Sequence, residues 1–206
     1  MNDDTLKNLD LQLSLFLAEI NPKKREQILQ NQTFSVEDIV EKELVLKKQS
    51  DPFIRAFIDQ LYRMLGNTAI SWKDRDGTTR ALSNVGVGGY AYLGTSNQAV
   101  AMDDYWVVTP IATGVGAGQM LYGINSSNYY GSSGIYTLGT SRVQINTTPF
   151  VNMSGGDITV EEVCFYGGQY VSSVWYYYTH ARDLTGSIVV ADGSALVVEY
   201  RLSVTV

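Results

Sequence analysis

Hydrophobic positions in the first 65 residues recur at the spacing of a helix. The first series has intervals of three and four residues and consists of Leu6, Leu9, Leu13, Phe16 and Ile20. This period places all five side chains on one helical face. Leu11, Leu15 and Leu17 widen that face, which indicates more than one apolar neighbour. The helix is expected to end at Asn21, because a residue that precedes proline avoids helical dihedrals.

Two further helices are predicted before residue 66. The second has Ser35 as its N-cap, Asp38 in its first turn, and apolar positions at Val36, Ile39, Val40 and Leu44. The third starts with Asp51 as cap and Pro52 at the first helical position. Its apolar stripe comprises Phe53, Ile54, Phe57, Ile58, Leu61, Met64 and Leu65, and Gly66 follows as C-terminal cap. Lys23, Lys24 and Arg25 are expected to form a solvated turn between the first two helices.

Residues 67–206 carry the alternating pattern of strands. The clearest strand places Leu196, Val198, Tyr200, Leu202, Val204 and Val206 on one face, with mostly polar residues on the other. Asp76-Gly77 and Asp192-Gly193 are dipeptides typical of hairpin turns. Many short strands with such turns favour an antiparallel β-sandwich of jelly-roll type. The predicted fold class is therefore α+β by segment, with a helical arm over 1–66 and a sandwich over 67–206.

The amino-acid composition also changes at Gly66, where the predicted helical arm meets the predicted sandwich. No glycine precedes it, 18 of the 19 glycines follow it, and 20 of the 36 charged side chains lie before it. The formal net charge is −6, which argues against electrostatic binding of nucleic acid. No apolar run reaches the roughly 18–20 residues of a membrane-spanning helix, and no signal-peptide pattern is present. We therefore expect a protein of the reducing cytoplasm that contacts no membrane and no nucleic acid.

Cysteine and histidine occur once each, which limits the chemistry. Cys164 can form no internal disulfide and no cysteine-rich zinc site, and its apolar neighbours predict a small buried side chain. A hydrolase of the Ser-His-Asp or Cys-His type would need His180, and no nucleophile elbow accompanies it. An unusual hydrolase stays as a third hypothesis behind the two given below.

Other candidate motifs are weak. Asp74-x-Asp76-Gly77 resembles the start of a calcium loop but lacks the later ligands, so a hairpin turn is predicted. Asp103-Asp104 and Glu161-Glu162 are adjacent pairs, whose side chains would point to opposite faces of a strand. Arg182-Asp183 is expected to be a structural ion pair at a strand end. The glycine-rich stretches at 86–94 and 114–118 lack the Lys-Ser/Thr and the helix of a phosphate loop. The sequence thus predicts no catalytic residue, no cofactor and no metal.

Aromatic residues are abundant, with 14 tyrosines, and Trp175 begins the run Trp-Tyr-Tyr-Tyr. Alternation along a strand places some of these rings inward and others outward, where they favour adhesion. Three interpretations stay open: a tyrosine-rich surface without a partner, an oligomer or partner interface, and a sugar-stacking site. The interface candidates are Leu6, Leu13, Phe16, Phe53, Phe57, Leu61, Trp175, Tyr176, Tyr177 and Tyr178.

Several stretches within residues 85–206 resemble one family. They are Leu93-Gly94-Thr95-Ser96 with Asp103-Asp104-Tyr105, the segment Gly116 to Gly123, the segment Phe150 to Tyr166, and Ala181-Arg182-Asp183-Leu184 with Asp192 to Tyr200. The pattern is similar to an Asn-x-Ser-Gly turn, an Ile-Thr-Val-x-Glu-Val strand, an Arg-Asp step and a final Gly-x-x-Leu-x-Val-x-Tyr strand. In this form it resembles a domain of minor virion proteins of tailed bacteriophages. Cys164-Phe165-Tyr166 stands where that family usually has Gly-Leu-Tyr.

The resemblance implies a β-sandwich that builds part of a virus particle and has no enzymatic activity. We therefore expect a structural protein of a virion assembled in the host cytoplasm, forming symmetric homo-oligomers bound to the capsid or the head-to-tail neck. Its partners would be its own copies and other virion proteins. The alternative is a carbohydrate-binding or adhesin module that uses the aromatic residues around Trp175.

Overall fold

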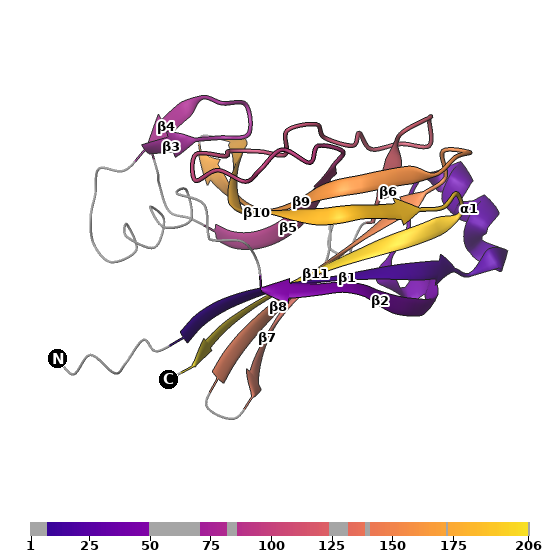
Figure 1. Ribbon diagram of the computed structural model, residues 1–206, viewed down its shortest axis with the longest axis horizontal. Coiled ribbons are helices and arrows are strands. Elements are labelled where there is room, and N and C mark those ends of the chain that lie inside the picture. The colour runs from indigo at the N-terminus through magenta and orange to yellow at the C-terminus, as the bar shows by residue number, and fades with distance from the viewer. Residues whose placement is uncertain are drawn as a thin grey trace. The chain divides into compact units, whose positions relative to one another are not determined.

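A computed structural model describes residues 8–49, 71–81, 86–123, 132–138, 141–171 and 173–205. The described chain is mostly antiparallel β-sheet with one short α-helix, which confirms a mainly β, α+β fold (Figure 1). It divides into two compact units. The first unit comprises Met1–Gln49, Ala112–Thr159 and Val189–Val206, and the second comprises Ser50–Ile111 and Val160–Ile188. Each unit is described separately below.

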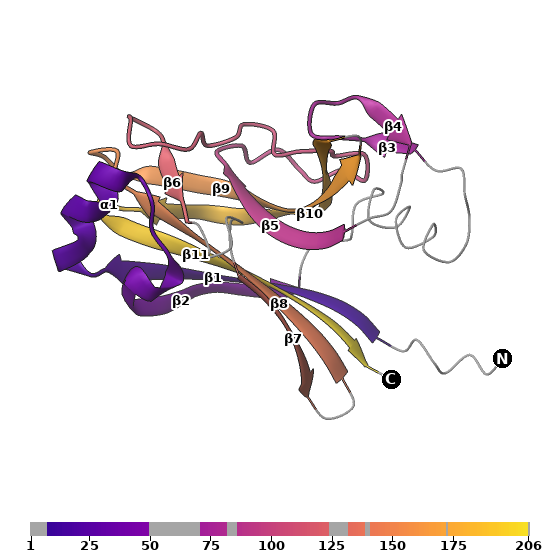
Figure 2. The same ribbon diagram turned by 180° about the vertical axis from the view of Figure 1, so that it is seen from behind.

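The first unit is built on a six-stranded sheet. Its strands are β1 (Asn8–Ile20), β2 (Ile39–Gln49), β6 (Met120–Tyr122), β7 (Ser132–Leu138), β8 (Ser141–Asn152) and β11 (Ser194–Thr205). Their order is β2-β1-β11-β8-β6, and β7 also pairs with β8. Figure 2 shows the helical segment with α1 at the end of this sheet where β1 leads toward β2. The last strand predicted from alternation is thereby confirmed as β11, at the centre of the sheet.

The predicted helix over residues 6–20 is wrong where the structure describes it, because residues 8–20 form β1. β1 pairs with β11 from Asn8 to Glu19, for example Leu13 opposite Tyr200. Leucines at 11, 13 and 15 satisfy a period of two as well as a helical one, and all three are buried. On the other face of β1, Asp10, Gln12 and Ser14 are polar, and only at the end of the strand are Ala18 and Ile20 buried in the core. The leucines from Leu9 to Leu15 therefore alternate with polar residues, as in a strand buried on one face, and the helical spacing of the longer series is coincidental.

The helical part of the first unit lies between the positions of the first and second predicted helices. A 3-10 turn, η1 (Pro22–Lys24), leads into α1 (Arg25–Asn31), where the sequence suggested only a solvated turn. The second predicted helix is wrong: after a 3-10 turn, η2 (Val36–Asp38), the chain continues as β2. The third predicted helix and Gly66 lie outside the described residues. Residues 8–49 therefore belong to the main sheet rather than to a separate helical arm.

Apolar side chains from the whole length of the chain fill the core beside α1. The buried members are Ala18, Ile20, Ile28, Phe34, Leu121, Val151, Met153, Ala195 and Val197. Asn152 organises the turn after β8: its amide nitrogen donates to the carbonyls of Gly156 and Val190, and its oxygen accepts from Ser154. The predicted Asn-x-Ser-Gly turn is thus held from within by a fully buried amide.

The second unit contains two small sheets. One has the order β10-β9-β5, formed by β5 (Gly86–Gly94), β9 (Ile158–Val171) and β10 (Val174–Val190). β9 begins, and β10 ends, with two residues that belong to the first unit. The other sheet is the hairpin of β3 (Ser71–Lys73) and β4 (Thr79–Ala81). The aromatic run from Trp175 to Tyr178 lies on β10 of this unit.

Candidate interaction surface

The hairpin of β3 and β4 is rigidly built around one buried carboxylate. Asp74 is almost fully buried and accepts hydrogen bonds from the backbone nitrogens of Asp76 and Thr78, at 3.0 and 2.9 Å. It also pairs with Arg80. Gly77 adopts a φ of +76°, a conformation that favours glycine. The prediction of a hairpin turn at Asp76-Gly77 is confirmed, and Asp74 is the group that holds it.

This hairpin places three cations over aromatic rings of the second unit. The guanidinium of Arg75 lies 5.6 Å from the ring of Trp106 and 5.2 Å from that of Tyr177. Lys73 and Arg80 make further contacts with Tyr105 and Tyr176, at 5.5 and 4.1 Å from the ring centroids. The hairpin is also joined to β10 directly, since the Arg75 backbone nitrogen donates to the Tyr177 carbonyl at 2.7 Å. We call these seven residues (Lys73, Arg75, Arg80, Tyr105, Trp106, Tyr176 and Tyr177) the cation–aromatic surface.

Further rings support this surface from behind. Tyr92, Trp106 and Tyr166 contact one another with centroids 4.6 to 5.5 Å apart, and Tyr177 meets Tyr166 edge-on at 5.6 Å. Tilted and edge-on arrangements of this kind are the favourable ones for aromatic pairs. The cluster packs on buried Val107 and Cys164. The orientation of Trp106 and Tyr177 is therefore fixed by packing on both sides.

Trp175 extends the surface toward solvent. Its side chain is 45% exposed, and its ring lies nearly parallel to that of Tyr177, with centroids 6.3 Å apart. Both rings reach Gly168 of the neighbouring strand, where an added Cβ would come within 3.1 and 3.2 Å of them. Glycine at this position thus allows the two rings to lie against β9.

The structure separates the predicted interface residues into three groups. Trp175 is exposed, and Tyr176 and Tyr177 are half-buried in the cation–aromatic surface. Tyr178 and Leu13 are fully buried, and Phe16 is half-buried against the core of the first unit. Leu6, Phe53, Phe57 and Leu61 lie outside the described residues. Among the predicted interface residues that the structure describes, Trp175 is the most exposed.

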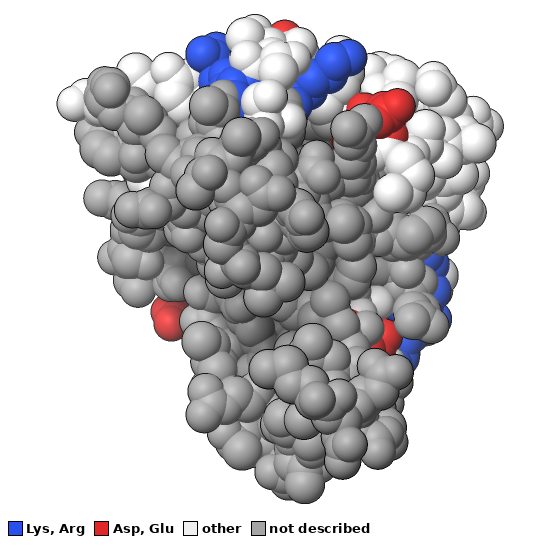
Figure 3. Space-filling view, turned by 90° about the vertical axis from the view of Figure 1, so that its left-hand side faces the viewer, with Lys and Arg blue, Asp and Glu red and all other residues white. Residues whose placement is uncertain are grey.

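Sequence reasoning missed the basic part of the surface. Nothing in the spacing of Lys73, Arg75 and Arg80 reveals that each faces a ring more than 25 residues away along the chain. Figure 3 shows Lys and Arg atoms flanking uncharged side chains at the top of one face, with acidic atoms nearby.

Both single-copy residues with reactive side chains are structural. The pKa of the Cys164 thiol is raised by burial, and its sulfur lies 3.2 Å from the Thr179 hydroxyl. That hydroxyl donates its proton to the Tyr105 carbonyl, so the thiol is the donor to Thr179. His180 is fully buried, and burial lowers its pKa to about 3. A protonated thiol and a neutral, enclosed imidazole are placed to pack and not to react.

Arg182 and Glu162 form a buried ion pair in the sheet of the second unit. The guanidinium donates to Glu162 and Asp104, and to the backbone carbonyls of Gln98 and Ala99. Burial disfavours the charged guanidinium, yet its pKa is raised because the hydrogen bonds to Glu162 and Asp104 outweigh that cost. The prediction of an ion pair with Asp183 at a strand end is wrong in its details, because Arg182 lies inside β10 and pairs with Glu162 and Asp104, which are distant in sequence. Glu161 instead bonds the Ser187 hydroxyl at the surface, so this adjacent pair diverges as predicted.

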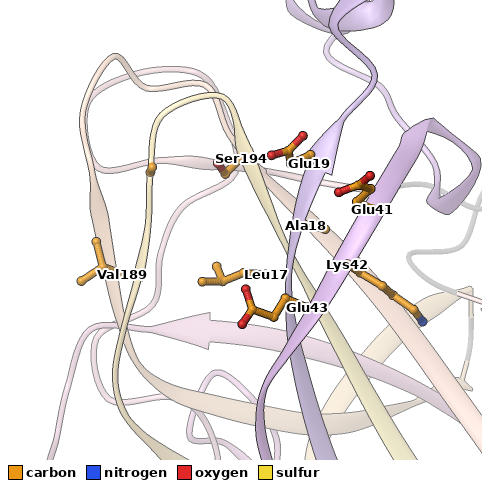
Figure 4. Close-up of a pocket in the computed structure, with 9 residues that line it drawn as sticks. Leu17, Ala18, Glu19, Glu41, Lys42, Glu43, Val189 and Ser194 are labelled. Atoms are coloured by element: carbon orange, nitrogen blue, oxygen red, sulfur yellow. The ribbon is translucent and has the colours of Figure 1, made fainter.

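A pocket of about 310 Å³ lies in the first unit, and Figure 4 shows its lining. Glu19 and Glu41 are directly opposite in the register of β1 and β2, and their carboxylates point the same way. Glu43 lies beside Leu17, whereas Lys42 points away from these carboxylates. Lys42 lies over the ring of Phe16, 4.5 Å from its centroid. The lining combines the carboxylates of Glu19, Glu41 and Glu43 with apolar residues that include Leu17, Val189 and Ala191.

Within the described ranges, no three His, Cys, Asp or Glu side chains gather in a way that could hold a metal ion. The described helices include none with the length and apolar character required to cross a membrane. Among the described residues, the cation–aromatic surface with Trp175 at its exposed end is the feature most suited to binding a partner. No protein-family model, no curated protein and no solved structure matches the chain.

Proposed function

We propose that the chain is a non-enzymatic structural subunit of a tailed-phage particle, which forms symmetric homo-oligomers attached to the capsid or the head-to-tail neck. The resemblance of residues 85–206 to minor virion proteins supports a role in a virus particle. The cation–aromatic surface supports attachment of the subunit to another virion protein. The single observation that carries the proposal is the exposure of Trp175 at the end of a fixed array of rings and cations.

The composition of this surface matches that of protein interfaces. Tyrosine, tryptophan and arginine are the side chains enriched at interface centres, because they offer large rigid contact areas with polar ends. Arg75 and Tyr177 are already ordered by contacts within the chain, so little entropy is lost when a partner covers them. Exposed Val174, next to Trp175, adds apolar area at the same end of β10.

The test uses particles from a phage whose copy of this gene is deleted. Purified protein should bind such particles, and Trp175→Ala should weaken binding about tenfold or more, as expected for a tryptophan at an interface centre. Leu29→Ala is the matched control, because Leu29 is an exposed apolar residue on α1, in the other unit. Equal binding by wild type and Trp175→Ala, or no binding by either, would contradict the attachment proposed here.

Carbohydrate binding is the second candidate, and one observation favours it. The near-parallel rings of Trp175 and Tyr177 lie side by side on one strand face, with the guanidinium of Arg75 beside Tyr177. Such a platform suits stacking of sugar rings with a hydrogen-bond donor at its edge. A glycan array tests for carbohydrate binding. Saturable binding that is lost in Trp175→Ala and kept in Leu29→Ala would favour this function.

A further inference from the structure

β2 is the end strand of the main sheet of the first unit. In the described part of the chain its ladder partner is β1, and no strand is paired to its other side. Three apolar side chains on β2 are markedly exposed, namely Val40, Leu44 and Val45. A long end strand with apolar side chains is a ready template for pairing with another strand.

Charges along β2 are arranged in an order that complements itself. Glu41 and Glu43 lie in the first half of the strand with Lys42 between them, and Lys47 and Lys48 lie in the second half. β2 runs from Ile39 to Gln49, so Leu44 is its middle residue. When two copies pair antiparallel over their full length, Leu44 meets Leu44 of the second copy. Glu41 then faces Lys47 in both symmetric positions.

Other registers are worse. Centring the pair on Val45 sets Glu43 against Lys47 but also Lys42 against Lys48. Centring it between Leu44 and Val45 sets Glu41 against Lys48 but also Lys42 against Lys47, so in both registers repulsion offsets the attraction. Like charges directly opposite destabilise a strand pair, whereas opposite charges stabilise it. Only the register centred on Leu44 combines the full strand length with attraction at both ends.

From these observations we propose that β2 binds β2 of a second copy of this chain, antiparallel and centred on Leu44, and so joins two sheets across a two-fold axis. The inference rests on the proposed function, since it supplies a contact for the homo-oligomer. A two-fold interface requires a patch that fits itself, and the charge order of β2 meets that requirement.

β2 also carries two register shifts against β1, one near Val45 and one near Val40. Bulges and charged residues are devices that protect an end strand from unwanted pairing. A purely protective strand needs only charges of one sign, because those repel a second copy. The acidic-then-basic order of β2 repels parallel or shifted partners and attracts the full antiparallel register. The bulges therefore limit which strands can pair with β2, and the charges favour β2 of a second copy among them.

Sedimentation velocity of the purified full chain tests the proposal. Wild type should show a dimer that dissociates on dilution. Glu41→Lys and Lys47→Glu should each raise the dimer dissociation constant roughly tenfold or more, and the double variant Glu41→Lys/Lys47→Glu should restore it to about the wild-type value. Glu26→Lys, an exposed reversal on α1, should change nothing. A monomer at all concentrations, or single reversals that dimerise like wild type, would overturn the proposal.

Cross-linking gives a second test that does not depend on charge. Directly opposed residues of antiparallel strands have Cα atoms about 4.5–5.5 Å apart, which suits a disulfide. Leu44→Cys should therefore form a covalent dimer under mild oxidation, whereas Leu29→Cys on α1 should not. The native Cys164 is fully buried and does not compete. A dimer without the Leu44→Cys cross-link would also overturn this register. Particle binding by Trp175→Ala reports on the proposed function independently, because Trp175 lies in the other unit.

Discussion

The Nε of Arg182 donates to Oε2 of Glu162 at 2.5 Å, and neither side chain is exposed. This pair ties β9 to β10 inside the second unit. Arg182 also fixes the loop before Val107 through the Gln98 and Ala99 carbonyls. A charged pair without water is costly to separate, because the remaining charge is left buried.

Arg182→Met should lower the free energy of unfolding by about 3–5 kcal/mol, since it strands the Glu162 carboxylate in the core. Urea denaturation followed by circular dichroism measures this change. Arg25→Met is the matched control, because Arg25 pairs with Asp192 at the surface and such pairs contribute about 0–1 kcal/mol. A loss below about 1 kcal/mol for Arg182→Met would show that the buried pair is not important for stability.

The free energy of unfolding should decline as the pH falls below about 6.5, because His180 is protonated in the unfolded chain but not in the folded one. Burial holds the folded-state pKa of His180 at about 3, so the unfolded chain binds a proton that the folded chain excludes. The contribution of neutral His180 to the free energy of unfolding is fully present above the unfolded pKa of about 6.5. Below that pH the free energy of unfolding falls by about 1.4 kcal/mol per pH unit. Denaturation of wild type and His180→Gln between pH 7 and pH 5 gives the comparison. Parallel curves for the two proteins would rule out this role.

Gly193→Ala should destabilise the turn before β11 by about 1–2 kcal/mol. Gly193 has a φ of +81°, and an added Cβ would lie 2.8 Å from the Arg25 guanidinium. Gly156→Ala is the control, because Gly156 has an ordinary φ and nothing within 4 Å of an added Cβ. Differential scanning calorimetry should show a clear drop in Tm for the first variant and almost none for the second.

Arg75→Ala should loosen the hairpin of β3 and β4 from the rings that it covers. Two contacts of the guanidinium with Trp106 and Tyr177 are lost, each worth about 0.5–1 kcal/mol at an exposed site. We expect a change in near-ultraviolet circular dichroism and a small loss of stability. Lys23→Ala removes an exposed cation and serves as control. An unchanged aromatic signal would mean that the hairpin is held by Asp74 and the backbone alone.

The sequence predicted the β part better than the helical part for a physical reason. β11 alternates cleanly and Asp76-Gly77 is a local turn, so both could be read from neighbours in the chain. The residues of β1 also fit a helix, and only their pairing with β11 decides between the two structures. Tertiary contacts thus override a local period, as they do for many buried strands.

The candidate surface was predicted in part. Trp175 and its tyrosines stand out by composition, and alternation correctly requires rings on both faces of their strand. Which ring is buried depends on neighbouring strands: Tyr178 is inside and Trp175 is outside. The cations over these rings come from a hairpin about 100 residues earlier, and no local pattern announces such a contact.

The pairing of β1 with β11 has a consequence for how the protein is made. The sheet of the first unit joins residues 8–20 to residues 194–205, with β8 on the far side of β11. During synthesis β1 leaves the ribosome long before its central partner exists. Contacts of such large sequence separation form slowly, and an unpaired apolar strand invites aggregation meanwhile. The first unit can therefore complete its sheet only after translation has reached β11.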